Sequence, residues 1–149
     1  MRIAVLCPSE IAFRRFMPAL SNIADFDFAG VGVNSVDERY GSHLPSDDLI
    51  HKMLLEENEK ADQFVQLYGG KVYDSYLSIV TANDIDAVYI PLPPALHYVW
   101  DKKALENGKH VLVEKPSTIS LSDSRDLVEL AQKNSLALHE NYMFIFHKQ

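Results

Sequence analysis

The sequence predicts an α/β protein with a doubly wound parallel sheet, in a three-layer αβα arrangement. Short apolar runs of strand length alternate with longer amphipathic segments along the whole chain, in the order βαβαβαβαβαβ. Several runs are apolar at nearly every position, as in strands that are buried on both faces. The length of 149 residues and the hydrophobic fraction of 47% suit one folded domain, residues 1–149.

Residues that break secondary structure separate the elements of the first half. Pro8 ends the first strand, and Ser9 follows as the expected N-cap of the first helix. Asn34–Ser35 forms a turn after the second strand. The charged run 56–60 is expected to be a solvated helix face, and Gly69–Gly70 is expected to end that helix. The expected strands cover residues 2–6, 26–33 and 71–73, and the expected helices cover 11–23, 46–66 and 75–81.

The second half repeats the alternation with sharper boundaries. Pro91, Pro93 and Pro94 stop one strand, because proline cannot donate to a sheet ladder. Gly108 ends the next helix, and Pro116 ends the strand after it. The expected strands cover 86–90, 110–113 and 136–138, the expected helices cover 95–107 and 120–133, and residues 142–146 look extended and aromatic.

The composition argues against several classes of protein. A formal net charge of −7 disfavours binding to the phosphate backbone of nucleic acids. A single cysteine, Cys7, excludes an internal disulfide and a cysteine-rich zinc site, and the histidines show no metal-ligand spacing, so no metal is expected. No apolar run approaches the ~18 residues of a membrane-spanning helix, and the apolar stretch near the start is too short for a signal peptide. We therefore expect a cytoplasmic protein without nucleic-acid or membrane partners.

The turn after the first strand is the first candidate site, because ligands of doubly wound sheets bind beyond the carboxyl ends of the strands. Cys7–Ala12 lies where a dinucleotide-binding fold carries G-x-G-x-x-G/A, whose glycines let backbone amides approach a pyrophosphate. Cys7 and Ser9 stand at the first two glycine positions, and only Ala12 keeps a small residue. By itself the turn is also consistent with an ordinary strand-to-helix connection capped by serine.

The end of the second strand leaves the choice between NAD and NADP open. An acidic residue there binds the ribose hydroxyls of NAD, but this chain has Asn34–Ser35. Arg39, which follows on a loop, could meet a 2′-phosphate, and a loop arginine is also commonly just solvated.

The stretch from His110 to Pro116 is the most informative one. A buried strand delivers Glu114, Lys115 and Pro116 to the ligand edge of the sheet. A lysine that is partly desolvated there can serve as an acid–base group, whereas the alternative is an ordinary surface lysine. A cis Lys115–Pro116 bond would aim the side chain.

Together these residues resemble the N-terminal nucleotide-binding domain of the Gfo/Idh/MocA oxidoreductases, in the sugar- and dihydrodiol-dehydrogenase branch. The most specific piece is residues 103–116, KALENGKHVLVEKP, in register with residues 84–97 upstream. Residues 11–20, 72–76 and 140–149 are also similar to the family. The resemblance covers nearly the whole chain except about residues 41–68, which we interpret as a longer helical insertion.

The resemblance implies a Rossmann fold that binds NAD or NADP and transfers a hydride to or from a sugar-like hydroxyl compound. Lys115 would be the catalytic acid–base group positioned by Glu114, and Lys115 and Tyr142 would contact the substrate. The implied cofactor-binding residues are those that follow the strands, namely Cys7, Ser9, Glu10, Ile11, Asn34, Ser35, Arg39, Pro91, Leu92, Pro93, His97, Glu114, Lys115 and Asn141. His97 is also consistent with a helix-start histidine that is hydrogen-bonded locally.

The chain departs from the family pattern in four ways, which include Pro94 and Ile145 at positions where the family often has polar residues. The missing glycines at positions 7 and 9 bear on cofactor affinity. The resemblance covers only the family's N-terminal domain, and the C-terminal domain would supply the substrate pocket. We therefore expect these residues to be inactive alone, with residues 142–149 leading toward that domain. Exposed aromatic residues there also allow a homo-oligomer. The alternatives are a non-catalytic binding or regulatory module that has lost cofactor affinity, and an interaction domain whose site a partner chain completes.

Overall fold

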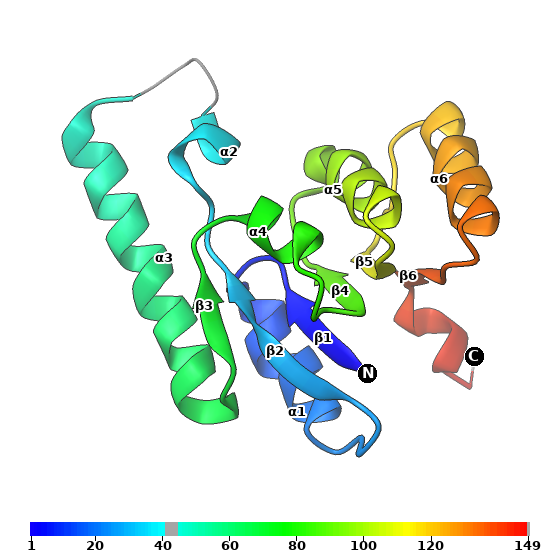
Figure 1. Cartoon of the computed structure of the whole chain (residues 1–149), viewed down its shortest axis with the longest axis horizontal. Helices are drawn as coiled ribbons and strands as arrows, with labels where there is room; N and C mark the ends of the chain where they lie inside the picture. Colours follow the sequence, from blue (N-terminus) through cyan, green and yellow to red (C-terminus); the bar gives the residue numbers. More distant parts are fainter. Residues whose placement is uncertain (41–44, 149) are drawn as a thin grey trace.

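The computed structural model describes residues 1–40 and 45–148 and confirms a doubly wound parallel sheet (Figure 1). Its strands are β1 (Arg2–Val5), β2 (Asp27–Gly32), β3 (Lys71–Tyr73), β4 (Ala87–Ile90), β5 (His110–Glu114) and β6 (Leu138–Asn141). They lie in the order β3-β2-β1-β4-β5-β6, and every adjacent pair is parallel. The chain therefore changes direction across the sheet between β1 and β4, which is the place where such folds bind ligands.

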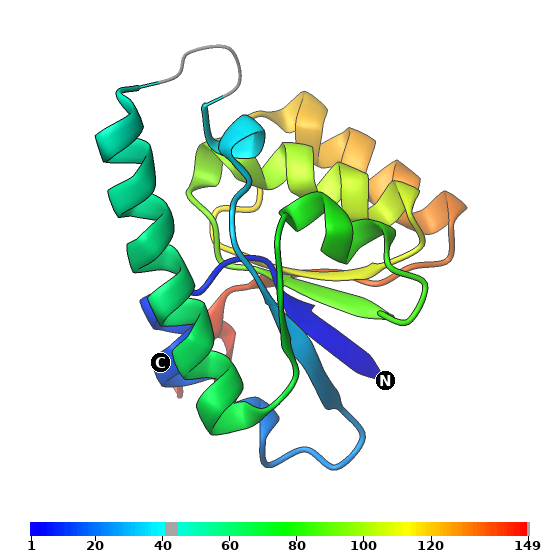
Figure 2. The same ribbon diagram turned by 60° about the vertical axis from the view of Figure 1, so that its left-hand side comes forward.

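Helices cover both faces of the sheet (Figure 2). The helical elements are η1 (Ala12–Phe16), α1 (Met17–Leu20), α2 (Val36–Tyr40), α3 (Asp47–Tyr68), α4 (Tyr76–Thr81), α5 (Pro94–Glu106), α6 (Leu121–Lys133) and η2 (Met143–Phe146). Alternate side chains of β4 enter two different cores. Val88 and Ile90 pack in the core beside α4, α5 and α6, whereas Ala87 and Tyr89 pack in the core beside η1, α1 and α3.

The first crossover helix, which runs from Glu10 to Leu20, contains one π-helical turn. The N–H of Met17 donates to the carbonyl of Ala12, five residues back. Pro18 follows and has no N–H to continue a regular α-helical ladder. The helix ends at Leu20, three residues before the end of the range 11–23 that the sequence predicts.

The last strand and the segment after it differ from the sequence-based expectation. Leu136 was expected in a strand, but it lies in a turn after Ser135, whose φ is +56°, and it packs against the core beside α6. Strand β6 starts only at Leu138 and ends opposite the last residue of β5, Glu114. The prediction of an extended segment at 142–146 is wrong, because the pairing of β5 with β6 ends at Glu114 and Asn141, and Met143–Phe146 then forms a 3₁₀ turn.

The expected insertion at about 41–68 is mainly one long helix. Residues 41–44 lie outside the described residues, and α3 fills the rest with 22 residues. Its C-terminal half packs on the sheet through Ala61 and Phe64, and the Phe64 ring meets Phe13 edge-on with centroids 5.1 Å apart. This contact holds α3 beside the start of the first crossover helix, so that α3 borders the ligand edge of the sheet (Figure 2).

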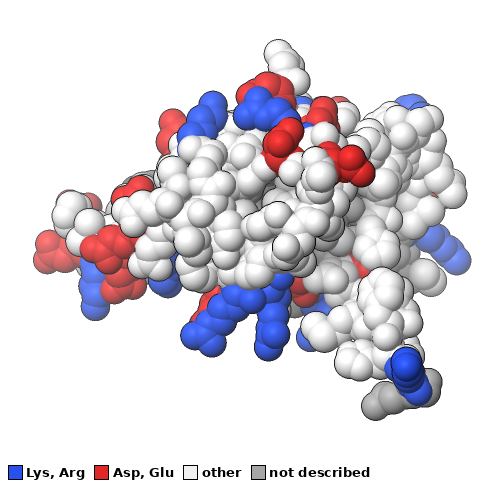
Figure 3. All heavy atoms as spheres, turned by 90° about the horizontal axis from the view of Figure 1, so that it is seen from below, with Lys and Arg blue, Asp and Glu red and all other residues white. Residues whose placement is uncertain are grey.

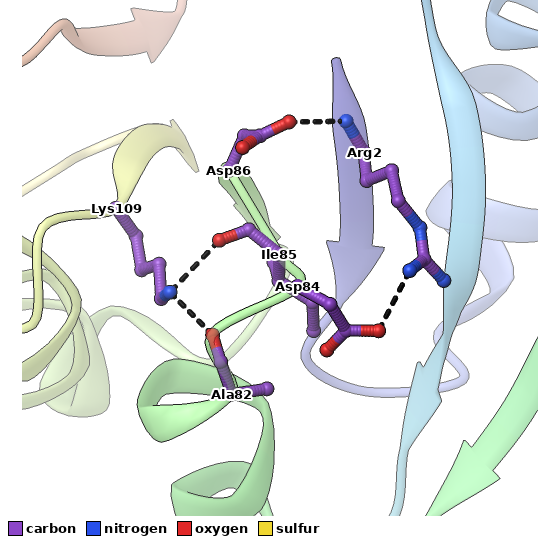
Figure 4. A network of polar contacts seen from close by, with 6 residues as sticks. All are labelled: Arg2, Ala82, Asp84, Ile85, Asp86 and Lys109. Atoms are coloured by element: carbon purple, nitrogen blue, oxygen red, sulfur yellow. Dashed lines mark hydrogen bonds and ion pairs between the residues drawn. The ribbon is translucent and has the colours of Figure 1, made fainter.

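Charged side chains at the opposite, amino edge of the sheet are paired within the fold (Figure 4). The Nζ of Lys109, which directly precedes β5, donates to the backbone carbonyls of Ala82 at 2.5 Å and Ile85 at 2.8 Å. The guanidinium of Arg2 forms an ion pair with Asp84 at 2.6 Å. On the face drawn in Figure 3, acidic and basic side chains both stand around a largely uncharged centre.

Within the described residues, no helix is long and apolar enough to cross a membrane.

Candidate functional site

The carboxyl edge of the sheet carries a cleft of about 490 Å³ at the place where the strand order reverses. Four of the predicted site residues line it, namely Cys7, Asn34, Leu92 and Pro93, which follow β1, β2 and β4. The far wall comes from α3 through Met53, Glu56, Glu57 and Lys60. These four residues, predicted from the sequence, therefore converge on one cleft, and the insertion helix supplies a wall that the sequence did not indicate.

A second cleft of about 380 Å³ lies on the other side of the first turn. Two predicted residues, Ser9 and Glu10, line it together with residues of η1 and α3. Pro8 and Lys60 line both clefts, so the two meet at the turn after β1. The turn is thus accessible from both sides, while its own backbone separates the clefts.

The turn after β1 is built as a capped helix start. The Oγ of Ser9 accepts the N–H of Ala12 at 3.2 Å, which confirms Ser9 as the cap. The amides of Glu10 and Ile11 belong to the first helical turn, where no carbonyl precedes them in the helix. The Glu10 carboxylate pairs with Arg14 at 2.8 Å, and both groups are exposed. Amide donors for an anion are therefore present despite the missing glycines.

Cys7, at the first glycine position, is held as a neutral thiol. Its Sγ lies 3.6 Å from the carbonyl of Pro91 and so links the ends of β1 and β4. Burial, with a smaller contribution from the nearby charge of Glu57, raises the pKa of Cys7 to about 12. A thiol with this pKa is a weak nucleophile, so Cys7 closes part of the edge by packing and donation rather than by reactivity.

The end of β2 receives a carboxylate from a distant part of the chain. The Oε1 of Glu57, on α3, accepts the backbone N–H of Asn34 at 3.0 Å and lies 3.5 Å from the hydroxyl of Tyr76. The expectation that residues 56–60 form a solvated face is wrong for Glu57, which is buried. The reason is that α3 passes close to the end of β2, which the local sequence of the helix does not indicate. The side chain of Arg39 lies outside the described residues.

Glu38 joins the turn after β2 to the start of α4. Its Oε2 accepts the N–H of Ser35, and the Oγ of Ser35 accepts the N–H of Glu38 at 3.2 Å, which is a reciprocal capping box. The Glu38 carboxylate also accepts the amides of Tyr76 at 2.9 Å and Leu77 at 2.8 Å, at the start of α4. The spacing Ser35-x-x-Glu38 was visible in the sequence, but the second helix start that Glu38 caps was not.

The ends of β5 and β6 meet at Glu114. Its Oε1 accepts the hydroxyl of Tyr89 at 2.5 Å and the Nδ2 of Asn141 at 2.6 Å. Burial and the hydrogen bond to Glu114 both raise the pKa of Tyr89, so its hydroxyl stays protonated and donates. Glu114 thus joins three neighbouring strands, and Tyr89 is a member of this group that the sequence did not single out.

Lys115 and Tyr142 lie outside both clefts. Lys115 is exposed. The prediction that its side chain is partly desolvated is therefore wrong for these residues taken alone. The Lys115–Pro116 peptide bond is cis. Tyr142 is 46% exposed and packs edge-on against Phe144, with centroids 5.4 Å apart.

His97 has no exposed surface, and both of its ring nitrogens lie within hydrogen-bonding distance of backbone carbonyls. Of the two alternatives for His97, the structure confirms the one in which the ring is hydrogen-bonded within the fold. A direct contact between its ring and a cofactor does not fit this placement.

Comparisons with known proteins agree with this geometry. A sequence profile of the GFO_IDH_MocA family, described as an oxidoreductase family with an NAD-binding Rossmann fold, matches residues 26–142. The chain is 37% identical over 147 residues to dTDP-3,4-didehydro-2,6-dideoxy-alpha-D-glucose 3-reductase of Saccharopolyspora spinosa, covering 99% of this chain and 38% of that protein. The chain thus spans well under half the length of the curated relatives it matches.

Solved structures show the same relationship. KijD10, a 3-ketoreductase from Actinomadura kijaniata solved with NADP and TDP-benzene, superposes with a TM-score of 0.79 at 32% identity, covering 100% of this chain and 39% of that one. Biliverdin reductase from Synechocystis, solved with biliverdin and NADP⁺, superposes with a TM-score of 0.76 at 19% identity. The second likeness concerns the fold alone.

Proposed function

Because the chain belongs to the GFO_IDH_MocA oxidoreductase family, with an NAD-binding Rossmann fold, we propose that residues 1–149 are the dinucleotide-binding domain of an oxidoreductase. The observation that carries the proposal is the cleft at the reversal of strand order, where residues that follow β1, β2 and β4 converge. A nicotinamide dinucleotide is an elongated ligand with a central pyrophosphate, which suits clefts on both sides of a helix start.

The first turn would hold the pyrophosphate. The amides of Glu10 and Ile11 open the crossover helix, and the helix dipole favours an anion at this end. Cys7 adds bulk where the fingerprint has glycine, but its thiol is turned toward the Pro91 carbonyl, which leaves the amides of the helix start exposed to a ligand. The residues present therefore fit a pyrophosphate, which would lie farther from the backbone amides than in a turn built of glycines.

The ends of the cleft would hold the two nucleoside halves. Asn34, Ser35 and Arg39 follow β2 and would meet the adenosine ribose or its 2′-phosphate. Pro91, Leu92 and Pro93 follow β4 and would line the nicotinamide half. The related KijD10 was solved with NADP, and we leave the choice between NAD and NADP to the binding experiment below.

When bound, the nicotinamide would supply or accept a hydride. We propose that Lys115 exchanges a proton with the hydroxyl or carbonyl oxygen of the substrate, because its ammonium group is exposed at the ligand edge. Glu114 is held by Tyr89 and Asn141 and would keep the adjoining Lys115 backbone in place. Tyr142 would lie on the substrate side. Relatives named as sugar 3-reductases suggest a sugar-like substrate, and the substrate pocket would come from a further domain.

Residues 142–149 would form the exit toward that domain. Tyr142, Met143, Phe144, Ile145 and Phe146 are each about half exposed or more, which makes an apolar surface suited to being covered. A cytoplasmic location and self-association of the complete protein belong to the same proposal.

The experiment is a fluorescence titration of the chain with NADH and, separately, with NADPH. We expect a saturable signal with at least one of the two, and the ratio of the two dissociation constants then identifies the preferred coenzyme. Lys115→Ala is expected to leave the affinity nearly unchanged, because Lys115 lies outside both clefts and is assigned here to chemistry with the substrate. The absence of saturable binding with either coenzyme would refute the proposal for this chain.

A second candidate function is a module that keeps the fold without binding a cofactor. The observation that favours it is the turn itself, where Cys7 and Pro8 replace a glycine and an amide donor. Cys7→Gly separates the two candidates. A nucleotide-binding domain should bind more tightly after the change, whereas a module with another role should show no new binding.

A further inference from the structure

His97 joins the loop after β4 to the loop after β5, which carries Lys115. It sits in the first turn of α5 and has no exposed surface. Its Nε2 lies 2.6 Å from the carbonyl oxygen of Leu92, in the loop after β4. Its Nδ1 lies 2.7 Å from the carbonyl oxygen of Pro116, the residue that follows Lys115.

Both partner atoms of the His97 ring can only accept hydrogen bonds. A carbonyl oxygen has no proton to give, so each ring nitrogen must donate one. A neutral imidazole has a single N–H, and its second nitrogen would then point a lone pair at an oxygen less than 3 Å away. Only a ring that carries a proton on both nitrogens, and with them a positive charge, can donate to both carbonyl oxygens at once.

Glu140, on β6, faces this charge from the other side of the Pro116 loop. Its Oε2 accepts the backbone N–H of Ser117 at 3.0 Å. That hydrogen bond lowers the pKa of Glu140, and the nearby charges of His97 and His139 lower it further. The carboxylate is thus anionic at neutral pH and supplies a negative charge close to the buried ring.

The remaining ionisable group next to His97 on its own helix is Asp101, one turn further along α5. It is fully buried, and within the described residues its carboxyl oxygens have no hydrogen-bond partner. Burial raises the pKa of Asp101 to about 8, so it is largely protonated at neutral pH and offers little countercharge. Glu140 is therefore the principal anion that stabilises the charged ring.

We infer that His97 and Glu140 are positioning residues that clamp the Lys115–Ser117 loop between the loop after β4 and strand β6. The clamp acts on the backbone directly after Lys115, at Pro116 and Ser117, and leaves the Lys115 ammonium exposed. Its relevance to catalysis rests on the proposed function, but the clamp itself is a property of this chain and is testable without a coenzyme.

The first measurement is the ¹⁵N NMR spectrum of the histidine rings of the unliganded chain at pH 7. We expect both ring nitrogens of His97 to show the shifts of protonated nitrogens. A neutral ring, with one unprotonated nitrogen, would overturn the inference.

The second measurement compares Glu140→Gln with Glu140→Ala. The glutamine keeps an oxygen that can accept the Ser117 amide but removes the charge, whereas the alanine removes both. We expect both variants to move one His97 ring nitrogen toward its unprotonated shift. Only Glu140→Ala is expected to speed hydrogen exchange of the Ser117 amide, by about tenfold for the loss of one hydrogen bond. Glu129→Gln, an exposed change on α6, is the control and should alter neither signal.

A purely structural Glu140 would move the Ser117 exchange without moving the His97 ring, and that result would also overturn the inference. The coenzyme titration is independent of these signals. If the NMR results hold and no coenzyme binds, the clamp stands and the proposed function falls.

Discussion

The two lysines that flank β5 have opposite surroundings. Lys109, just before the strand, is 6% exposed, and its ammonium group donates to two backbone carbonyls. Lys115, just after the strand, is exposed, and no hydrogen bond or ion pair holds its side chain within residues 1–40 and 45–148. The same residue type thus stabilises the fold at one end of a strand and remains available to a ligand at the other.

The two edges of the sheet repeat this contrast on a larger scale. At the amino edge, Arg2 pairs with Asp84, and the backbone N–H of Arg2 donates to Asp86 at 2.7 Å (Figure 4). At the carboxyl edge, buried or partly buried carboxylates such as Glu38 and Glu57 accept backbone amides and order the loops around a cleft. Opposite charges at the amino edge satisfy one another, whereas carboxylates at the carboxyl edge organise a surface that remains open.

The largest effect is expected at Asp101, a buried residue of α5 whose carboxyl group has no hydrogen-bond partner among residues 1–40 and 45–148. A carboxyl group whose pKa in the folded state, about 8, exceeds its ordinary value of 3.8 favours folding only while it is protonated. Wild-type stability should therefore fall as the pH rises from about 4 to about 8, by about 5 kcal/mol in total. Asp101→Asn should lack this fall.

Urea unfolding of both proteins at pH 5 and pH 8 measures the difference. The quantity of interest is the change with pH rather than the stability at one pH, since the asparagine amide is also buried. Parallel stability curves for the two proteins would contradict the raised pKa of Asp101.

The next largest effect is expected at the amino edge. Lys109→Met keeps the length of the side chain and leaves the carbonyls of Ala82 and Ile85 without their donor. We expect the free energy of unfolding to fall by about 3 kcal/mol, because two carbonyls and the end of α4 lose a charged partner. Lys133→Met, at an exposed position of α6, is the matched control. Equal losses in the two variants would mean that the buried contacts of Lys109 contribute nothing.

A smaller effect is expected for the exposed ion pair of the same edge. The side chains of Arg2 and Asp84 are 44% and 51% exposed, so solvent weakens their attraction. Asp84→Asn should lower the free energy of unfolding by about 0.5 kcal/mol, and 0.5 M salt should reduce the difference from the wild type. A loss comparable to that of Lys109→Met would remove the distinction between buried and exposed charges at this edge.

The smallest effect on stability is expected at Lys115. Lys115→Met should change the free energy of unfolding by no more than about 0.5 kcal/mol, since the side chain contacts nothing charged in the described structure. Thermal unfolding followed by circular dichroism tests this directly. A large loss of stability would show that the lysine is structural, and the contrast with Lys109 would disappear.

The residues of the candidate site differ in how far the sequence could locate them. Cys7, Asn34 and Pro93 follow apolar runs that are easily recognised, and parallel strands bring their ends to one edge. The sequence predicts an exposed Glu57, because its neighbours in the helix are charged. Only the path of α3 past the end of β2 buries it. Tyr89 lies within an apolar run, and Asp101 begins the charged run 101–103, so nothing in the local sequence marks the contact of the first or the burial of the second.

By itself, the sequence determined the alternation of strands and helices, the ligand edge and the family resemblance, because these depend on local periodicity and on short motifs. Only the tertiary structure decided which charges are used. Lys109 finds two carbonyls, His97 finds two more, Glu57 reaches the end of β2 and Lys115 stays exposed. The physical reason is that the free energy of a charge depends on its burial and on partners that are distant along the chain, which neighbouring residues in the sequence do not specify.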